Sequence, residues 1–181
     1  MIRSKIEYFL NAVLYFLWFF HKRVGQYTDR LISLIPKYFF TDNFRKKYNE
    51  NMIKEKPRVD EFYNNKKNGF YIGMADYWFD SFYYLYSCAI SFIIAGCFIK
   101  RDGKIDGVTT SMIVFIIIGI SAILPLKMIF IKDRYLKYFK EFEKEDEHWH
   151  KKWKRITIAF CIGGVITFLS GLGVAWIILL S

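Results

Sequence analysis

Two groups of acidic and histidine side chains have the spacing that acid–base or metal chemistry requires. In the first group, Asp76 and Asp80 are one helical turn apart, so their carboxylates could share a proton or bind a cation. A helix start or contact with headgroup water accounts for the same pair more simply. We therefore expect Asp76 and Asp80 to be structural, with acid–base work as the alternative.

The second group precedes the last apolar stretch of the chain. Glu143, Asp146 and His150 are spaced by three and four residues, so on one helix they would share a face and could bind a divalent metal. His148 and His150 are two residues apart and point in different directions, unlike the histidines of a HExxH site. A solvated, charged helix face accounts for the same residues, and we expect no metal there.

No other pattern that enzymes use is present. The sequence has no nucleophile beside a base, no phosphate-binding loop and no nucleotide fingerprint, so we expect neither a cofactor nor catalysis. Cys88, Cys97 and Cys161 all fall in apolar stretches and are odd in number. This disfavours a disulfide framework and predicts buried thiols that act as small apolar side chains.

The elements that must hold these residues are indicated by how the charges are segregated. The chain has 181 residues, of which 54% are hydrophobic and 24% charged, a length that suits one domain. The stretches 81–99, 108–126 and 156–181 contain no Asp, Glu, Lys or Arg. About 20 apolar residues in a helix cross a bilayer. The sequence therefore predicts an all-α, polytopic membrane protein with transmembrane helices at 79–99, 108–127 and 156–180.

The N-terminal stretch 6–22 predicts a further hydrophobic helix. Its apolar part is interrupted only by Asn11 and is followed by His21, Lys22 and Arg23. This part would extend about 20 Å as a helix, which is short for crossing a bilayer unaided. No small-x-small cleavage site follows, which disfavours a signal peptide. We expect a retained fourth transmembrane helix, with a helix lying flat in the interface as the alternative.

The basic residues predict the topology. Segment 21–78 carries 12 Lys and Arg, segment 127–155 carries 10, turn 100–107 carries three, and the N-terminus carries two. Positive loops stay in the cytoplasm, so both rich segments are expected there, with 100–107 and the C-terminus outside. This orientation accounts for the net charge of +10 without a nucleic-acid partner. The Lys-, Asn- and Ile-rich composition favours a bacterial source and its inner membrane.

Segments between the spans have patterns of their own. Apolar residues at helical spacing over 24–40 predict an amphipathic helix that lies on headgroups or packs on the spans. Segment 41–69 predicts short helices joined by loops, and the aromatics of 69–86 predict an interfacial belt, with ligand stacking as the alternative. Turn 100–107 predicts a hairpin. Segment 128–155 predicts a cytoplasmic helix with an aromatic face and a break around 145–150.

Small residues predict how the spans pack. They recur every four residues along the last span, at Ala159, Gly163, Thr167, Gly171 and Ala175, and a shorter row lies in the first span, at Ser87, Ser91 and Ala95. Small residues let helix backbones approach closely in a membrane. We expect the two rows to meet, within one molecule or between copies.

A basic cluster precedes the last span. It consists of Lys151, Lys152, Lys154 and Arg155, and clusters of this kind contact anionic lipid headgroups. We therefore expect the bilayer, and its anionic lipids, to be partners of the chain.

The expected function is a non-enzymatic membrane protein that binds another protein, or a second copy of itself, in an accessory, regulatory or immunity-type role. One alternative is an oligomeric channel or transporter, whose pore would use Asn11, Thr109, Thr110, Thr167 and Ser170. The absence of ionisable residues from the three spans disfavours transport. A second alternative is a membrane enzyme that acts on lipid through Asp76, Asp80 or the His148 region.

Overall fold

The fold is helical throughout the part of the chain that the structure describes. This computed structural model describes residues 4–39, 41–102 and 107–180, with all their side chains except those of 35–39, 44, 45, 48, 49, 52 and 102. No strand occurs in these ranges, so the predicted all-α class is confirmed. The elements in chain order are α1 (Lys5–Phe39), α2 (Asp42–Asn64), α3 (Phe70–Asp102), α4 (Gly107–Pro125), a π-helical turn η1 (Leu126–Phe130), a 3₁₀ turn η2 (Ile131–Asp133), α5 (Arg134–Phe142) and α6 (Glu147–Leu180).

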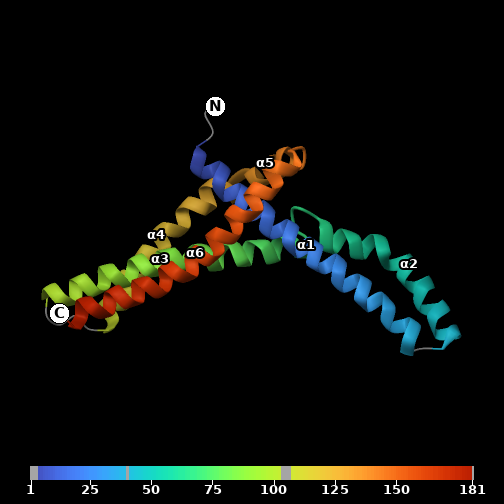
Figure 1. Cartoon of the computed structure of the whole chain (residues 1–181), viewed down its shortest axis with the longest axis horizontal. Coiled ribbons are helices and arrows are strands. Elements are labelled where there is room, and N and C mark those ends of the chain that lie inside the picture. The colour runs from blue at the N-terminus through green and yellow to red at the C-terminus, as the bar shows by residue number, and fades with distance from the viewer. Residues whose placement is uncertain (1–3, 40, 103–106, 181) are drawn as a thin grey trace.

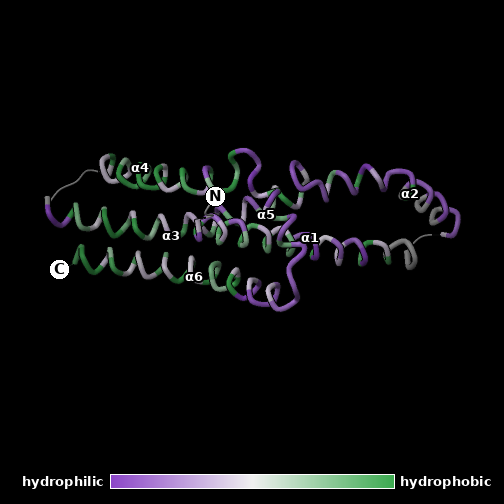
Figure 2. The backbone as a smooth tube through the Cα atoms, turned by 90° about the horizontal axis from the view of Figure 1, so that it is seen from above, coloured by the Kyte–Doolittle hydropathy of each residue, from purple (hydrophilic) through white to green (hydrophobic). Residues whose placement is uncertain are grey.

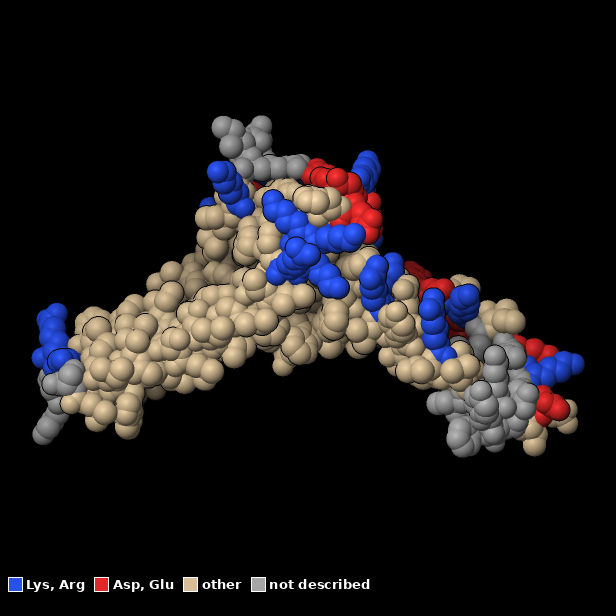
Figure 3. Space-filling model, viewed as in Figure 1, with Lys and Arg blue, Asp and Glu red and all other residues tan. Residues whose placement is uncertain are grey.

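Helices α3, α4 and α6 lie side by side as a bundle (Figure 1 and Figure 2). The segments Phe70–Arg101, Gly107–Phe142 and Glu147–Leu180 are long and apolar enough to cross a membrane, as the sequence predicted. The central helix is α3, with α6 packed along one side of it and α4 along another. Figure 3 shows this bundle almost free of charge except at its far tip. All three cysteines are free, and none is buried as predicted: Cys97 is exposed, and Cys88 and Cys161 are half-buried.

Helix α1 is one unbroken helix, whereas the sequence predicted a boundary at 22–24. Its residues 10–18 are only 0–7% exposed, and they form a hydrophobic core with residues of α3, α5 and α6. The expected fourth span is not confirmed, because α1 is not among the helices long and apolar enough to cross a membrane. An apolar run of 10 to 14 residues is more typical of a buried core helix, and α1 is used in that way.

The second half of α1 and all of α2 extend away from the bundle as a helical hairpin (Figure 1). We call residues 24–64 the arm. The prediction of short helices and loops over 41–69 was wrong, because α2 is continuous from Asp42 to Asn64 with Pro57 inside it. The helix ends at an Asx turn, in which the Asn65 side-chain oxygen accepts a hydrogen bond from the Lys67 backbone N–H at 2.8 Å.

The segment after α4 is not the single helix predicted for 128–155. Helix α4 ends at Pro125, and the positive φ angles of Lys132 (61°) and Asp133 (51°) then reverse the chain so that α5 folds onto α1. A second break, at 143–146, precedes α6. The aromatic face of α5 is therefore part of the core rather than a surface for partners; its buried residues are Tyr135, Tyr138, Phe139 and Phe142.

The two basic segments predicted to share a side of the membrane contact each other at one end of the bundle. The Lys66 ammonium lies 2.6 Å from a Glu143 carboxylate oxygen, and the Lys67 ammonium lies 2.7 Å from Asp133. The Tyr135 hydroxyl also donates a hydrogen bond to the Lys67 carbonyl, at 3.3 Å. We call this end, where α1, α5 and the loop between α2 and α3 meet, the basic end.

Candidate functional site

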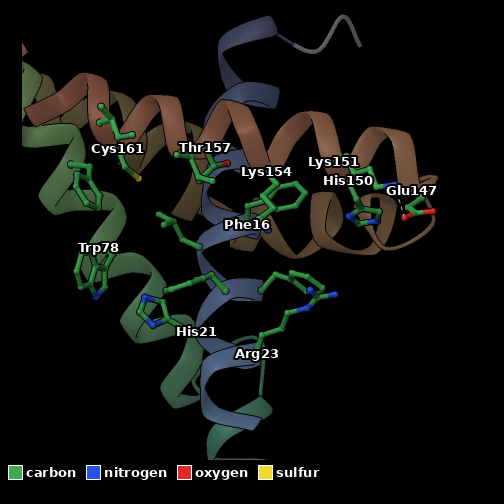
Figure 4. Close-up of a pocket in the computed structure, with 16 residues that line it drawn as sticks. Phe16, His21, Arg23, Trp78, Glu147, His150, Lys151, Lys154, Thr157 and Cys161 are labelled. Atoms are coloured by element: carbon green, nitrogen blue, oxygen red, sulfur yellow. Dashed lines mark ion pairs between the residues drawn. The ribbon is translucent and has the colours of Figure 1, made fainter. Parts of the chain in front are cut away.

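A groove with a volume of about 600 Å³ lies at the basic end, between α1, the start of α3 and the start of α6 (Figure 4). Its size is within the usual range for small-molecule and cofactor sites. Each helix contributes two large apolar side chains four residues apart, a spacing that places both on one helix face. These pairs are Phe16 and Phe20 from α1, Trp78 and Phe82 from α3, and Ile158 and Ile162 from α6.

Cationic side chains surround the apolar walls. Arg23 of α1 and Lys151 and Lys154 of α6 line the groove, and Figure 4 shows α1 and α6 contributing cations from facing sides. Lys151 is paired with Glu147 at 2.8 Å, the only carboxylate among the lining residues that the structure describes. The Arg23 guanidinium lies over the Phe19 ring at 4.5 Å, an arrangement that leaves its N–H donors available to a ligand.

Two histidines join the cations. His21 is half-buried with its ring 6.0 Å from that of Trp78, and burial lowers the pKa of His21 below its ordinary 6.5. It is therefore neutral at pH 7 and has one donor and one acceptor nitrogen. His150 packs edge-on against the Trp149 ring at 5.2 Å and lies 5.8 Å from the Phe16 ring. Arg23 and Lys154 are the lining cations that are not paired with the Glu147 carboxylate.

One buried polar atom in the groove wall lacks a partner. Thr157 is 6% exposed, and its hydroxyl makes no hydrogen bond. In an α-helix a threonine hydroxyl usually bonds to a carbonyl one turn earlier, which this one does not. Figure 4 shows the hydroxyl on the side of α6 that faces α1. An unsatisfied buried hydroxyl is unfavourable by about 1–3 kcal/mol, so this position favours a ligand with an acceptor oxygen.

The predicted metal ligands are not brought together. Glu143 is bound by Lys66, and Asp146 accepts a hydrogen bond at 2.7 Å from the Trp149 backbone N–H at the start of α6. His150 is packed among aromatic rings. The shared helix face does not exist, because residues 143–146 form the break before α6. Within the ranges that the structure describes, no three His, Cys, Asp or Glu side chains gather as metal ligands would.

The acidic pair on α3 lies outside the groove. Asp76 and Asp80 share a helix face with Tyr83, whose hydroxyl donates a hydrogen bond to the Ser121 carbonyl of α4 at 3.0 Å. The pair therefore faces the α4 side, whereas Trp78 and Phe82 face the groove. One Asp76 carboxylate oxygen is buried without a hydrogen bond. His148, the other predicted catalytic residue, is exposed on the first turn of α6.

Within one molecule, the two predicted rows of small residues do not meet. A Cβ atom added to Gly171 would lie 2.8 Å from the Ala89 Cα atom, and one added to Gly96 would lie 3.5 Å from Ala175. The partners of Gly171 and Ala175 are thus Ala89 and Gly96. Ser87, Ser91 and Ala95 are buried on the Tyr83 face, which faces α4. On α6, Ala159 is exposed and Gly163 and Thr167 are half-buried, so a seven-residue spacing through Gly164 describes the interface better.

The basic cluster is divided by the helix that carries it. Lys151 and Lys154, three residues apart, both line the groove. Lys152 and Arg155 are exposed and are not among the residues that line the groove, and the indole of Trp153, between them, packs 5.5 Å from the Tyr8 ring. The four cations therefore do not form one surface: two are available to a groove ligand and two to the surroundings.

The predicted pore residues are dispersed. The Asn11 side-chain amide is fully buried and donates hydrogen bonds to the Glu7 carbonyl at 2.7 Å and to the Met128 carbonyl at 3.2 Å. It thereby ties α1 to the π-helical turn. Thr109 and Thr110 begin α4 at the far end of the bundle (Figure 1), while Thr167 and Ser170 lie on α6. These positions line no common channel in one molecule.

The arm carries the other candidate surface. Four apolar side chains at helical spacing on α1 are exposed by 41–66%: Val24, Tyr27, Leu31 and Leu34. We call this set the stripe. The arm leaves the bundle at Gly25, where an added Cβ would clash with the Tyr71 side chain of α3. A larger residue at position 25 would require the Tyr71 ring, which is 6% exposed, to move.

The groove was not predicted, because its walls come from three segments far apart in the sequence. The spacing of Lys151 and Lys154 was the only signal, and nothing in the sequence showed which apolar residues would face them. Comparisons of the chain with protein-family models, with curated proteins and with solved structures find no match.

Proposed function

We propose that this chain is a non-enzymatic integral membrane protein that presents its arm to a partner protein. The observation that carries the proposal is the stripe, an apolar helix face outside the bundle. Full burial of a leucine-sized side chain is favourable by about 1.5–3 kcal/mol. A contact that covers Tyr27, Leu31 and Leu34 would therefore contribute several kcal/mol toward the cost of association.

The charges on the arm favour a protein over a bilayer surface as the partner. Helix α2 has six basic and five acidic residues, which alternate along its length. Helices that bind anionic bilayers carry an excess of Lys and Arg on the polar face. A nearly balanced, mixed surface is instead suited to charge complementarity with another protein. The contrast with the cluster of four cations at 151–155 supports this distinction.

The proposed location is a bacterial inner membrane, with the basic end and the arm in the cytoplasm. Positive loops are retained on that side, and contact between the two basic segments is consistent with their sharing it. The channel and lipid-enzyme alternatives gain no support. The polar pore candidates are dispersed, and Asp76 and Asp80 lie on the α4 side of α3, outside the groove.

Co-purification from native membranes in mild detergent tests the proposal. We expect the full chain to carry a defined protein, at a fixed ratio, that is identified by mass spectrometry. Leu31→Glu should reduce the recovered partner by about tenfold or more, because it places a charge in the buried contact. Gln26→Glu is the matched control, since it adds the same charge on the opposite face of α1 and should leave recovery unchanged.

Recovery of the chain alone under these conditions would contradict the proposal. So would equal losses from the two variants, because a diffuse charge effect would not distinguish the stripe from the opposite face. Recovery of a second copy of this chain would show that the chain is its own partner and forms a homodimer. The same pair of variants would test whether the stripe forms that interface.

A further inference from the structure

The groove has charge, shape and an unsatisfied hydroxyl that the arm does not explain. We propose that it binds one anionic glycerophospholipid. The phosphate lies between Arg23 and Lys154, an ester oxygen accepts a hydrogen bond from Thr157, and one acyl chain follows the apolar face of α6. This site is independent of the arm and of its proposed protein partner.

The charge at the groove selects an anion. Lys151 is neutralised by Glu147, whereas Arg23 and Lys154 have no carboxylate partner within the part of the chain that the structure describes. Both cations are exposed at the rim of the groove, so they are accessible to an anionic ligand. Arginine binds phosphate oxygens through two parallel hydrogen bonds, and lysine adds a point charge.

The apolar walls select a ligand with a chain. They continue out of the groove along α6 through Ile158, Ile162 and Ile166, which are 49–58% exposed and recur every four residues. This row follows the helix into the segment long and apolar enough to span the membrane. An acyl chain can therefore run from the groove along α6 without leaving an apolar surface. A free phosphate ion would leave these walls uncovered.

The order of polar groups along α6 matches that of a glycerophospholipid. Lys154 precedes Thr157 by three residues, a rise of about 4.5 Å along the helix, and Ile158 and Ile162 follow. A lipid presents its phosphate, then its ester oxygens, then its acyl chain in the same order. Thr157 is 6% exposed and its buried hydroxyl is unpaired, so this hydroxyl can donate to an ester carbonyl that lies deeper than the phosphate.

Native mass spectrometry of the full chain, released from nanodiscs or mild detergent, tests this site. Phosphatidylglycerol is titrated against phosphatidylcholine, which has the same phosphodiester but a compensating ammonium. We expect one phosphatidylglycerol to be retained per chain, at least about tenfold more strongly than phosphatidylcholine. Millimolar inorganic phosphate should not displace it, because the acyl chain supplies part of the affinity.

Matched variants locate the site. Arg23→Gln with Lys154→Gln removes two groove cations, and we expect at least about a tenfold loss of phosphatidylglycerol retention. Lys152→Gln with Arg155→Gln removes two cations from the same cluster but outside the groove, and should change retention less than about twofold. Thr157→Val keeps the side-chain shape, removes the hydroxyl, and should reduce retention severalfold.

Equal losses from the two double variants would overturn the proposal, because they would indicate a diffuse attraction of basic residues to anionic lipid. Equal retention of the two lipids, or displacement by inorganic phosphate, would overturn it as well. If the Arg23 and Lys154 double variant does not fold, Thr157→Val decides, and unchanged retention in that variant contradicts the site.

Discussion

The two halves of α1 both carry apolar side chains, but these have opposite surroundings. Residues 10–18 are 0–7% exposed and form the centre of the core, whereas Val24, Tyr27, Leu31 and Leu34 on the same helix are exposed by 41–66%. The first half is covered by α3, α5 and α6. The second half extends past them into the arm. The role of an apolar helix face thus depends on what packs against it. Within the described part of the chain, nothing packs over the stripe.

A leucine-to-alanine substitution should change the free energy of unfolding far more in the first half of α1 than in the second half. Leu14→Ala removes a fully buried side chain and should lower the free energy of unfolding by about 2–5 kcal/mol. Leu31→Ala should change it by less than about 0.5 kcal/mol, because this side chain is 66% exposed. Thermal unfolding of both variants in one detergent measures the contrast. Comparable destabilisation by both would show that the arm packs against the rest of the molecule.

Two glycines on α6 extend the contrast between covered and uncovered faces to the bundle. Gly171→Leu should destabilise the protein by about 1–3 kcal/mol through overpacking, since an added Cβ would lie 2.8 Å from both the Cα and the Cβ of Ala89. Gly173→Leu should have little effect, because nothing lies within 4 Å of an added Cβ there. The measurement is again the unfolding midpoint. A Gly171→Leu protein as stable as the Gly173→Leu control would refute the described contact between α3 and α6.

His21 lies at the border between the two halves of α1, and it should make a smaller contribution to stability that depends on pH. Burial lowers the pKa of His21, so below its ordinary pKa of about 6.5 the unfolded chain binds more protons than the folded chain. Stability from this group is present at pH 7 and declines as the pH falls. His21→Asn should lose less stability than wild type between about pH 7 and pH 5. An identical pH profile for the two proteins would contradict this assignment.

Much of the bundle could be predicted from the sequence, because uncharged apolar stretches of about 19 residues or more are rare outside membrane-spanning helices. The division of α1 at residue 23 was wrong for a physical reason. Lys22 lies over the Trp18 ring at 5.1 Å and Arg23 over the Phe19 ring at 4.5 Å. Their charges reach the surface while the helix continues, as long cationic side chains allow. A charged residue in a sequence therefore indicates that the end of its side chain reaches the surface. It does not indicate where a helix ends.

The reversal before α5 had no detectable signal. Lys132 and Asp133 adopt positive φ, yet neither is glycine and only aspartate is moderately tolerant of that region. The chain reversal turns the aromatic face of α5 inward, which removed the partner surface that the sequence indicated. The groove was unpredictable for a related reason, because its walls are assembled by tertiary packing of α1, α3 and α6.

The proposed function depends on another protein covering the stripe in native membranes. A photo-crosslinking amino acid placed singly at Leu31, at Phe115 on the exposed face of α4, and at the buried Leu14 tests this dependence. We predict a discrete adduct with one protein from position 31, lipid adducts from position 115, and adducts within the chain from position 14. Lipid adducts alone from position 31, or the same products from positions 31 and 115, would show that no protein covers the stripe.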